Sequence, residues 1–201
     1  MKYIIATHNA KKLTELSRIL VPLGIEAVTD RDLDIALTEV EETGTTFEAN
    51  AYLKAASACK ESGLPAVADD SGLCVDALDG APGLYSARYA GEGASDEEKI
   101  AKLLDALKDV KEEDRTARFV SAICCVFPDG RQLTARGECE GTIAFAPSGN
   151  GGFGYDPVFV VGDKSFADMT AEEKDAVSHR GRSLRAFSDV LAAYLKGESN
   201  E

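Results

Sequence analysis

The fold of this chain is decided near its start, by residues 2–20, KYIIATHNAKKLTELSRIL. Residues 2–6 form a short apolar run that ends at polar Thr7, which predicts a buried strand. Helix signals follow at once, because Asn9 is a favoured N-cap and three leucines then recur on one helical face. A strand that leads directly into a helix predicts an α/β protein.

The rest of the chain continues this mixture of strands and helices. Capped helices are expected after Thr45 with Glu48, after Ser95 with Glu98, after Thr170 with Glu173 and after Ser178. A turn at 128–130 joins two long strands as a hairpin. The order of the elements predicts a mixed sheet flanked by helices, with loops gathered around a cleft. The further strands are expected at 25–29, 66–68, 116–127, 131–144 and 157–161, and residues 73–78 are expected to continue extended after the loop at 69–72.

Composition excludes several classes of function. The chain has 201 residues, with 22 Lys and Arg against 35 Asp and Glu, a formal charge of −13. Such a charge disfavours nucleic acid and anionic membranes as partners. No apolar run approaches the roughly 18 residues of a membrane span, and the first residues are not typical of a signal peptide. The five cysteines lack metal or disulfide spacing, which favours buried thiols in the cytoplasm.

The loop at residues 7–12, THNAKK, places lysines at the start of a helix. The helix dipole already gives this end a positive potential, so lysines here do not stabilise the helix. A bound phosphate would reverse that effect, because backbone N–H groups, dipole and Lys12 would all favour it. Two solvated lysines are the alternative interpretation.

Acidic residues follow in two further loops. Glu39, Glu41 and Glu42 precede a helix, where acids are ordinary stabilisers. Asp69 and Asp70 come directly after the strand at 66–68, in a sequence that also suits a turn. Adjacent carboxylates are costly to bury unless a cation neutralises them, and oxygen ligands beside a polyphosphate would suit Mg²⁺.

A glycine-rich loop at 149–154 contains a formal GxGxxG match. A dinucleotide site is excluded, because the sequence continues as a strand rather than as a helix. The glycines instead favour close approach to a flat ligand, with Phe153 either stacked on it or buried. Lys174 and Arg180 then supply cations near another helix start, where a solvated Arg180 is the alternative.

Six motifs in order resemble those of the inosine triphosphate pyrophosphatase family, the RdgB-like non-canonical purine NTP pyrophosphatases. The resemblance runs from residue 3 to about residue 187. The motifs are THNAKK, EETGTTFEANA, ADDSGL, GAPGLYSARYAG, GGFGYDPVF and EEKDAVSHRGRSL.

This resemblance implies an elongated α/β protein of one domain over 1–201, with two lobes around a central mixed sheet and the substrate in the cleft. It implies a cytoplasmic homodimer that hydrolyses ITP, dITP and XTP to the monophosphate and pyrophosphate with Mg²⁺. A non-catalytic nucleotide-binding module and a Maf-type pyrophosphatase are the alternatives. The first would not need the carboxylates, and the SHR and GGFGYDP motifs disfavour the second.

The resemblance also assigns roles to individual residues. Asp70 is the general base, and Glu41 and Asp70 contact the metal. Either His179 or Arg180 donates to O6 of the base. The expected substrate-binding residues are Thr7, His8, Asn9, Ala10, Lys11, Lys12, Ser71, Phe153, Gly154, Tyr155, Asp156, Lys174, His179 and Arg180.

Overall fold

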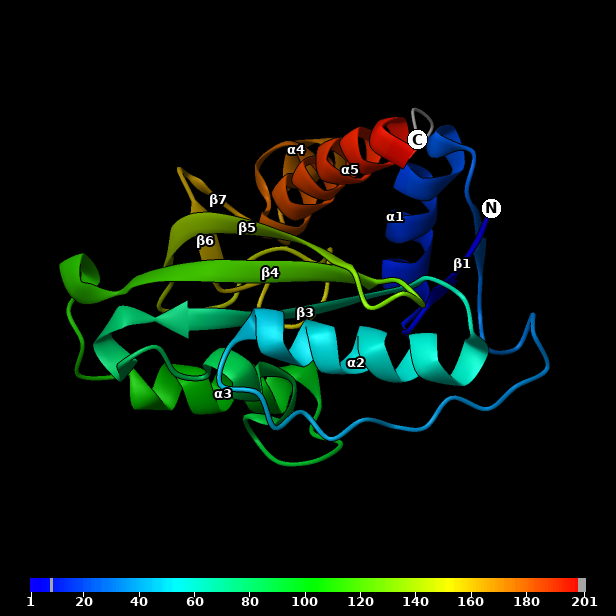
Figure 1. Ribbon diagram of the computed structural model, residues 1–201. Helices are drawn as coiled ribbons and strands as arrows, with labels where there is room; N and C mark the ends of the chain where they lie inside the picture. Colours follow the sequence, from blue (N-terminus) through cyan, green and yellow to red (C-terminus); the bar gives the residue numbers. More distant parts are fainter. Residues whose placement is uncertain (8, 199–201) are drawn as a thin grey trace. The chain divides into compact units, whose positions relative to one another are not determined.

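The computed structural model describes residues 1–7 and 9–198, with the backbone alone at positions 10 and 11. Within these residues seven strands pair in the order β2-β1-β3-β4-β5-β6-β7, and helices flank the sheet (Figure 1). The strands are β1 (Lys2–Ile5), β2 (Glu26–Val28), β3 (Ala66–Val75), β4 (Thr116–Val126), β5 (Gln132–Ile143), β6 (Phe159–Val161) and β7 (Lys164–Ser165). The predicted mixed α/β fold is confirmed.

Five α-helices and four short 3-10 turns connect these strands in the described chain. The helices are α1 (Ala10–Leu20), α2 (Phe47–Ser62), α3 (Asp96–Ala106), α4 (Ala171–Val177) and α5 (His179–Glu198). The 3-10 turns are Val21–Leu23, Asp76–Leu78, Gly83–Arg88 and Glu112–Asp114. None of the described helices is long and apolar enough to cross a membrane.

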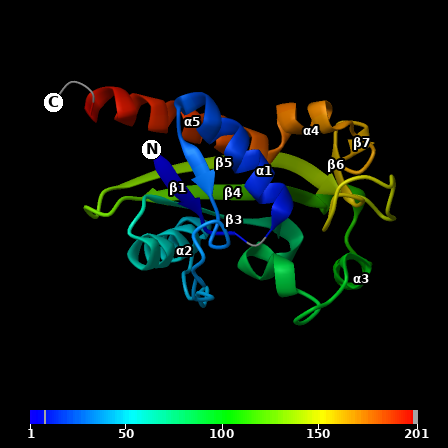
Figure 2. The same cartoon turned by 90° about the vertical axis from the view of Figure 1, so that its right-hand side faces the viewer.

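The chain divides into two compact units. The first contains Met1–Asp70, Ser121–Gly137 and the chain from Arg182 onward. Its strands β1, β2 and β3 run parallel, as the βα order predicts. Side chains alternate between its two faces, so that Ile5 packs with α1 and α5 while Ile4 packs with α2. Figure 2 shows α1 and α5 side by side on one face of the strands.

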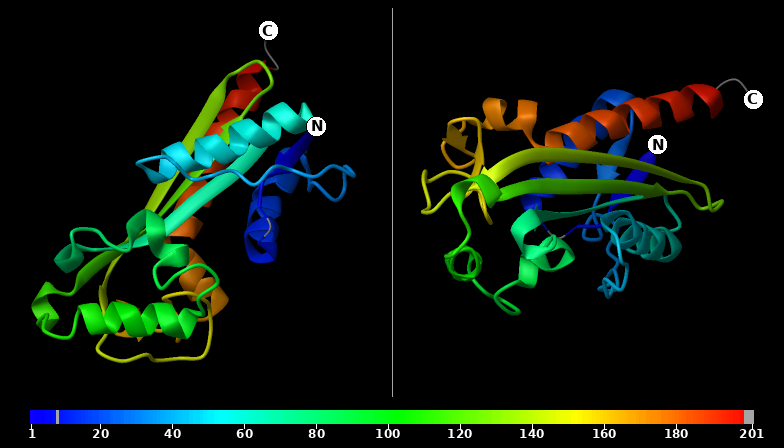
Figure 3. Two further views of the ribbon diagram at one scale, coloured as in Figure 1. Left: turned by 90° about the horizontal axis from the view of Figure 1, so that it is seen from below. Right: turned by 90° about the vertical axis from the view of Figure 1, so that its left-hand side faces the viewer.

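The second unit contains Ser71–Val120 and Glu138–Gly181. Strands β5, β6 and β7 are antiparallel here. Leu103 of α3 and Leu107, directly after it, pack onto a core with Phe159 and Phe166. Figure 3 shows β4 and β5 as a long hairpin, as the turn at 128–130 predicts. Buried aromatic rings therefore dominate this core.

Arg115 is the largest fully buried side chain of the second unit, with 2 % of its surface exposed. Its guanidinium donates to the backbone carbonyls of Leu107, Val110, Ile143 and Ala144 at 2.8–3.3 Å. Five donors in a fixed fork allow one arginine to satisfy carbonyls at the end of α3 and beyond β5 together. The residue is therefore a structural tie.

Most predicted helix starts are confirmed, and three boundaries are corrected. Capping boxes form at Ser95 and Thr170, and Ser178 caps α5. The cap of α2 is Thr46, which accepts from the Ala49 N–H, rather than Thr45. Strand β6 begins two residues later than expected, and β3 continues to Val75 instead of ending at 68.

The cysteines confirm the predicted buried thiols. Cys59, Cys124, Cys125 and Cys139 are buried, and Cys74 is half-buried. Burial raises the pKa of the Cys124 thiol to about 11, so it stays protonated at neutral pH.

Candidate functional site

Two local hydrogen bonds link residues 7, 9 and 12, in the loop that the sequence predicts to bind phosphate. The hydroxyl of Thr7 accepts from the Asn9 N–H at 3.2 Å, and the Asn9 side chain accepts from the Lys12 N–H at 3.3 Å. Asn9 is therefore the N-cap of α1, as predicted. His8 lies outside the described residues, as do the side chains of Ala10 and Lys11.

Lys12 is not a solvated lysine. Its ammonium lies 2.9 Å from a carboxylate oxygen of Asp69, and their side chains are 19 % and 5 % exposed. This ion pair explains why a lysine lies at the positive end of a helix dipole, because the lysine neutralises a buried acid.

Strand β3 sends its two adjacent carboxylates to opposite faces. Asp69 meets Lys12 from α1, whereas Asp70 meets Lys54 and Asn50 from α2. A continuous strand alternates its side chains, and a turn would not have separated them in this way. The acid pair is thus neutralised by two different lysines.

Both oxygens of Asp70 are held. Oδ1 accepts from the Lys54 ammonium at 3.1 Å, and Oδ2 accepts from the Asn50 amide at 3.3 Å. Burial raises the pKa of the Asp70 carboxyl more than Lys54 lowers it, and the like charge of Glu42 adds to the rise. A carboxylate with a raised pKa is a better proton acceptor than an ordinary one.

The acidic loop contacts this group through Glu42. Its carboxylate lies 2.9 Å from the Lys54 ammonium, whereas the Glu41 side chain is exposed. Burial lowers the pKa of Lys54, but Asp70 and Glu42 together outweigh it and the net pKa is raised. The lysine therefore stays charged between two acids.

Gly44 anchors the same loop, because its N–H donates to Oδ1 of Asn50 at 2.8 Å. A Cβ at this position would lie 2.6 Å from that amide oxygen. The close approach of the loop backbone to Asn50 therefore requires glycine at position 44. Since the Asn50 amide also donates to Asp70, Asn50 links the acidic loop to Asp70.

The second unit gathers most of the predicted base-binding residues. Phe153 is 37 % exposed, so it is not a core residue. Its N–H donates to Oδ2 of Asp156 at 2.9 Å, and Lys174 pairs with the same oxygen at 2.5 Å. Gly152 has φ +74°, and a Cβ there would overlap the Asp156 carboxylate. Asp156, 3 % exposed, thus shapes the loop that presents the ring.

Two cations lie over the Phe153 ring. The Lys174 ammonium is 5.1 Å and the Arg180 guanidinium carbon 5.6 Å from the ring centroid. Arg180 also donates to the Ser71 hydroxyl at 3.3 Å and is only 9 % exposed, so the solvated alternative is wrong. These groups combine an aromatic face with positive charge.

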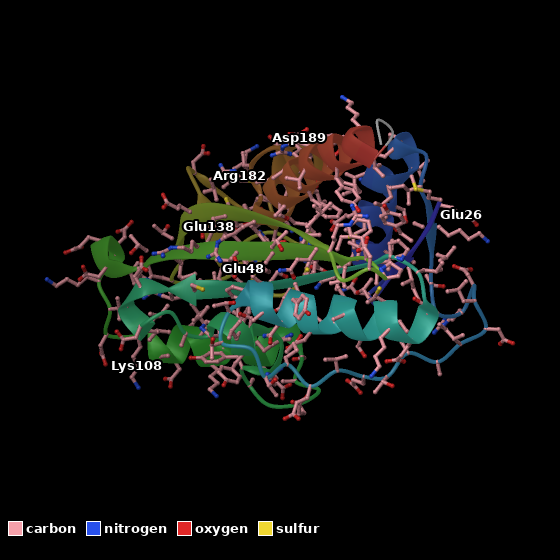
Figure 4. All side chains as sticks on the ribbon, in the orientation of Figure 1. Glu26, Glu48, Lys108, Glu138, Arg182 and Asp189 are labelled. Atoms are coloured by element: carbon pink, nitrogen blue, oxygen red, sulfur yellow. The ribbon has the colours of Figure 1, made fainter. Side chains whose placement is uncertain are left out.

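His179 and Tyr155 are fixed by packing. The His179 ring stacks on Phe119, with centroids 4.7 Å apart, and is 6 % exposed. Tyr155 is buried, and its hydroxyl donates to the Ser86 carbonyl at 2.9 Å. Burial raises the pKa of this phenol, so it remains a neutral donor. Arg182, labelled in Figure 4, lies three residues beyond His179 on the exposed side of α5.

Asp70 with Lys12 and Lys54 lies in the first unit, and Phe153 with Lys174 and Arg180 lies in the second. Comparisons with known proteins identify the family. Residues 3–190 match the sequence profile of the Ham1 family. This chain belongs to the Ham1 family. A dITP/XTP pyrophosphatase of Exiguobacterium sp. is 52 % identical over 199 residues, which cover 98 % of this chain and 100 % of that protein. One of Shigella flexneri is 48 % identical, with 94 % and 98 % covered.

Solved Ham1 structures have the same fold. A HAM1 protein from Coxiella burnetii gives a TM-score of 0.90 at 41 % identity, covering 96 % of this chain and 99 % of that one. A nucleoside-triphosphatase / dITP/XTP pyrophosphatase from Mycobacterium abscessus gives 0.80 at 49 % identity, with 92 % and 97 % covered. The resemblance stated from the motifs is confirmed.

Sequence reasoning missed two residues of the candidate site, Lys54 and Asn50, and it named Glu42 only as one of three acids in its loop. Asn50 and Lys54 are four residues apart on α2, beside the buried alanines that pack on the sheet. Two polar residues at helical spacing next to a buried stripe are a signal of a buried polar contact.

Proposed function

We propose that this protein hydrolyses non-canonical purine nucleoside triphosphates, ITP, dITP and XTP, to the monophosphate and pyrophosphate. Ham1 membership and relatives named dITP/XTP pyrophosphatase support this activity. The observation that carries it is Asp70, a buried carboxylate with a raised pKa that Lys54 and Asn50 orient. Asp70 takes the proton of the attacking water.

The triphosphate is bound by the loop at residues 7–12. Lys12 supplies charge, and the N-terminus of α1 supplies N–H groups and its dipole. The side chains of Thr7 and Asn9, together with the backbone at 10 and 11, complete the contacts to the phosphates. Because the protein carries −13 overall, such local cations are needed to bind an anionic substrate.

The acidic residues fit a hard divalent cation. Asp70 and Glu42 offer oxygen ligands, and Lys54 already occupies the point where their negative charges converge. Mg²⁺ is commonly held by one or two carboxylates plus substrate phosphates, so two acids are enough. We assign Asp70 and Glu41 to Mg²⁺ on the resemblance of their motifs, and Glu42, which shares Lys54 with Asp70, is a further oxygen ligand within the same loop as Glu41. When bound, Mg²⁺ would lower the pKa of a coordinated water.

The base is read by the second unit. Phe153 stacks on the purine, and Gly154, Tyr155 and Asp156 complete the wall of the base pocket. Lys174 and Ser71 contact the substrate. Hypoxanthine and xanthine have a 6-keto oxygen that adenine lacks, and Arg180 or His179 donates to it. Guanine has the same oxygen, so rejection of GTP requires a site in which the 2-amino group of guanine finds no hydrogen-bond acceptor.

Assembly and location rest on the motif resemblance and on composition alone. We propose a homodimer in the cytoplasm, and the net charge of −13 disfavours nucleic acid and anionic membranes as partners. A non-catalytic module is disfavoured because it would not need the Asp70 arrangement, and a Maf-type activity is disfavoured by the family.

The test is a panel of purine and pyrimidine triphosphates with detection of pyrophosphate and monophosphate. We expect release from ITP, dITP and XTP well above ATP, GTP and CTP, loss of activity in chelator, and recovery with Mg²⁺. Binding of ITP without product would instead establish the regulatory module. Preference for pyrimidine substrates would establish the Maf-type alternative.

A further inference from the structure

The Phe153 ring is oriented by carboxylates on both sides of its residue, and we propose that Asp96 is a positioning residue for purine binding. The Gly154 N–H donates to Oδ2 of Asp96 at 2.6 Å. Asp96 is the first residue of α3 and lies 58 positions away in the chain. The inference rests on the proposed function, because it concerns how the purine-stacking ring is held.

The geometry of the backbone gives Asp96 its effect. The peptide before Phe153 is fixed by its N–H to Asp156, and the peptide after it by the Gly154 N–H to Asp96. Because each peptide is planar, holding both restricts φ and ψ of Phe153 and therefore the direction of its Cα–Cβ bond, from which the ring projects. Asp156 alone would leave the second peptide free to rotate, particularly since Gly154 has φ +62°.

Helix stability alone does not account for this contact. Ser95 and Glu98 already form the capping box of α3. The two carboxylate oxygens of Asp96 have different partners. Oδ1 pairs with the Lys99 ammonium at 2.7 Å, and Oδ2 accepts from the Gly154 N–H. A hydrogen bond from an N–H to an ionised carboxylate is short and strong, as this one is. Lys108, labelled in Figure 4, lies just beyond the opposite end of this helix.

The test compares Asp96→Ala with Glu97→Ala. Glu97 is the next residue, exposed, and contributes the same charge to the same helix end. For Asp96→Ala we expect a KM for ITP raised about tenfold and kcat within about twofold, because the ring contributes to ground-state and transition-state binding alike. The Ki of tripolyphosphate, which lacks a base, should not change. Glu97→Ala should leave all three values unchanged.

A second readout does not depend on activity. In the protein without nucleotide, the Gly154 amide should exchange faster in Asp96→Ala than in Glu97→Ala, measured by NMR. Asp96→Asn keeps an acceptor oxygen and should restore the KM to within about threefold. If Asp96→Ala does not fold, Asp96→Ser is used, because its hydroxyl is too short to reach Gly154.

Distinct outcomes separate the two proposals. An unchanged KM in a variant whose Gly154 amide has lost protection would overturn the positioning role. An equal effect of Glu97→Ala would reduce Asp96 to a helix-end charge. Absence of ITP hydrolysis in the unmodified protein would overturn the proposed function, and with it the base-binding role assigned to Asp96.

Discussion

Truncation of Phe153 to alanine tests the base-binding half of the proposal most directly. The ring is 37 % exposed and has the cations of Lys174 and Arg180 at 5.1 and 5.6 Å from its centroid. A large apolar ring held in this position without being buried is placed to receive a planar ligand. Alanine removes that surface and leaves the backbone ties of the loop intact.

The expected magnitude follows from the exposure and from stacking energies. Stacking of a base on an aromatic side chain is worth about 1–3 kcal/mol, so the KM for ITP should rise by about 5- to 150-fold. XTP should lose the same factor, because stacking does not read exocyclic groups. The loss of stability should stay near 1 kcal/mol, since the ring is far less buried than a core phenylalanine.

Phe166 provides a matched control. It lies in the same unit, and the Lys174 ammonium is 5.3 Å from its centroid, but it is only 1 % exposed. Phe166→Ala should cost about 3–5 kcal/mol of unfolding free energy, a fall in Tm on the order of 10 °C. The control therefore separates loss of packing from loss of stacking.

The assay combines steady-state kinetics with thermal unfolding of the protein without nucleotide. Phe153→Tyr keeps an aromatic face and should retain a KM near that of the unmodified protein. A large fall in Tm for Phe153→Ala with an unchanged KM would refute the reasoning and make Phe153 a packing residue. An unchanged KM with an unchanged Tm would leave the ring without a role in binding.

Three further variants test the other groups. Asp70→Asn should abolish turnover, while Tm at pH 7 stays unchanged or rises. The fold raises the pKa of Asp70, so ionisation of this carboxyl lowers stability as pH rises. A neutral amide does not ionise and avoids that loss. Near-normal activity would remove Asp70 from catalysis. Lys12→Ala should weaken tripolyphosphate inhibition and, because it removes a cation from the buried carboxylate of Asp69, should cost about 3 kcal/mol of stability. Adding Asp69→Asn should restore Tm but not inhibition. Recovery of both would make Lys12 purely structural. Arg115→Met should cost about 3 kcal/mol in denaturant unfolding with kcat/KM unchanged where the protein is folded, and a selective loss of activity would contradict a structural role.

The starts of the helices and the hairpin turn were predicted well, because caps and turns depend on interactions between residues close in the sequence. The capping boxes at Ser95 and Thr170 and the hairpin turn depend on residues within a few positions of one another. The error at Thr45 has a longer-range cause. Gly44 is fixed against Asn50, and Thr46 is the residue left in an extended conformation, with φ −138° and ψ 159°, before the first turn.

The candidate site was predictable only in part. Motifs identified Asp70, Lys12, Phe153 and Arg180, but not which partner each one meets. Lys54, on α2, lies 16 positions before Asp70 in the chain, and Asp96 lies 58 positions before Gly154. Such contacts depend on packing of whole elements, which helical or strand periodicity does not specify.

The most consequential difference between expectation and structure is the path of β3. Asp69 and Asp70 suit a turn by composition, yet the strand continues through them to Val75. Because a strand alternates its side chains, each carboxylate reaches a different helix and a different lysine. The two acids therefore have separate surroundings. Asp69 is charge-balanced by Lys12, whereas Asp70 is oriented by Lys54 and Asn50 and has a raised pKa. Adjacent carboxylates on one face would instead repel each other and titrate as a pair, so the alternation along the strand gives each acid its own lysine and leaves Asp70 free for the proton-accepting role that we propose for it.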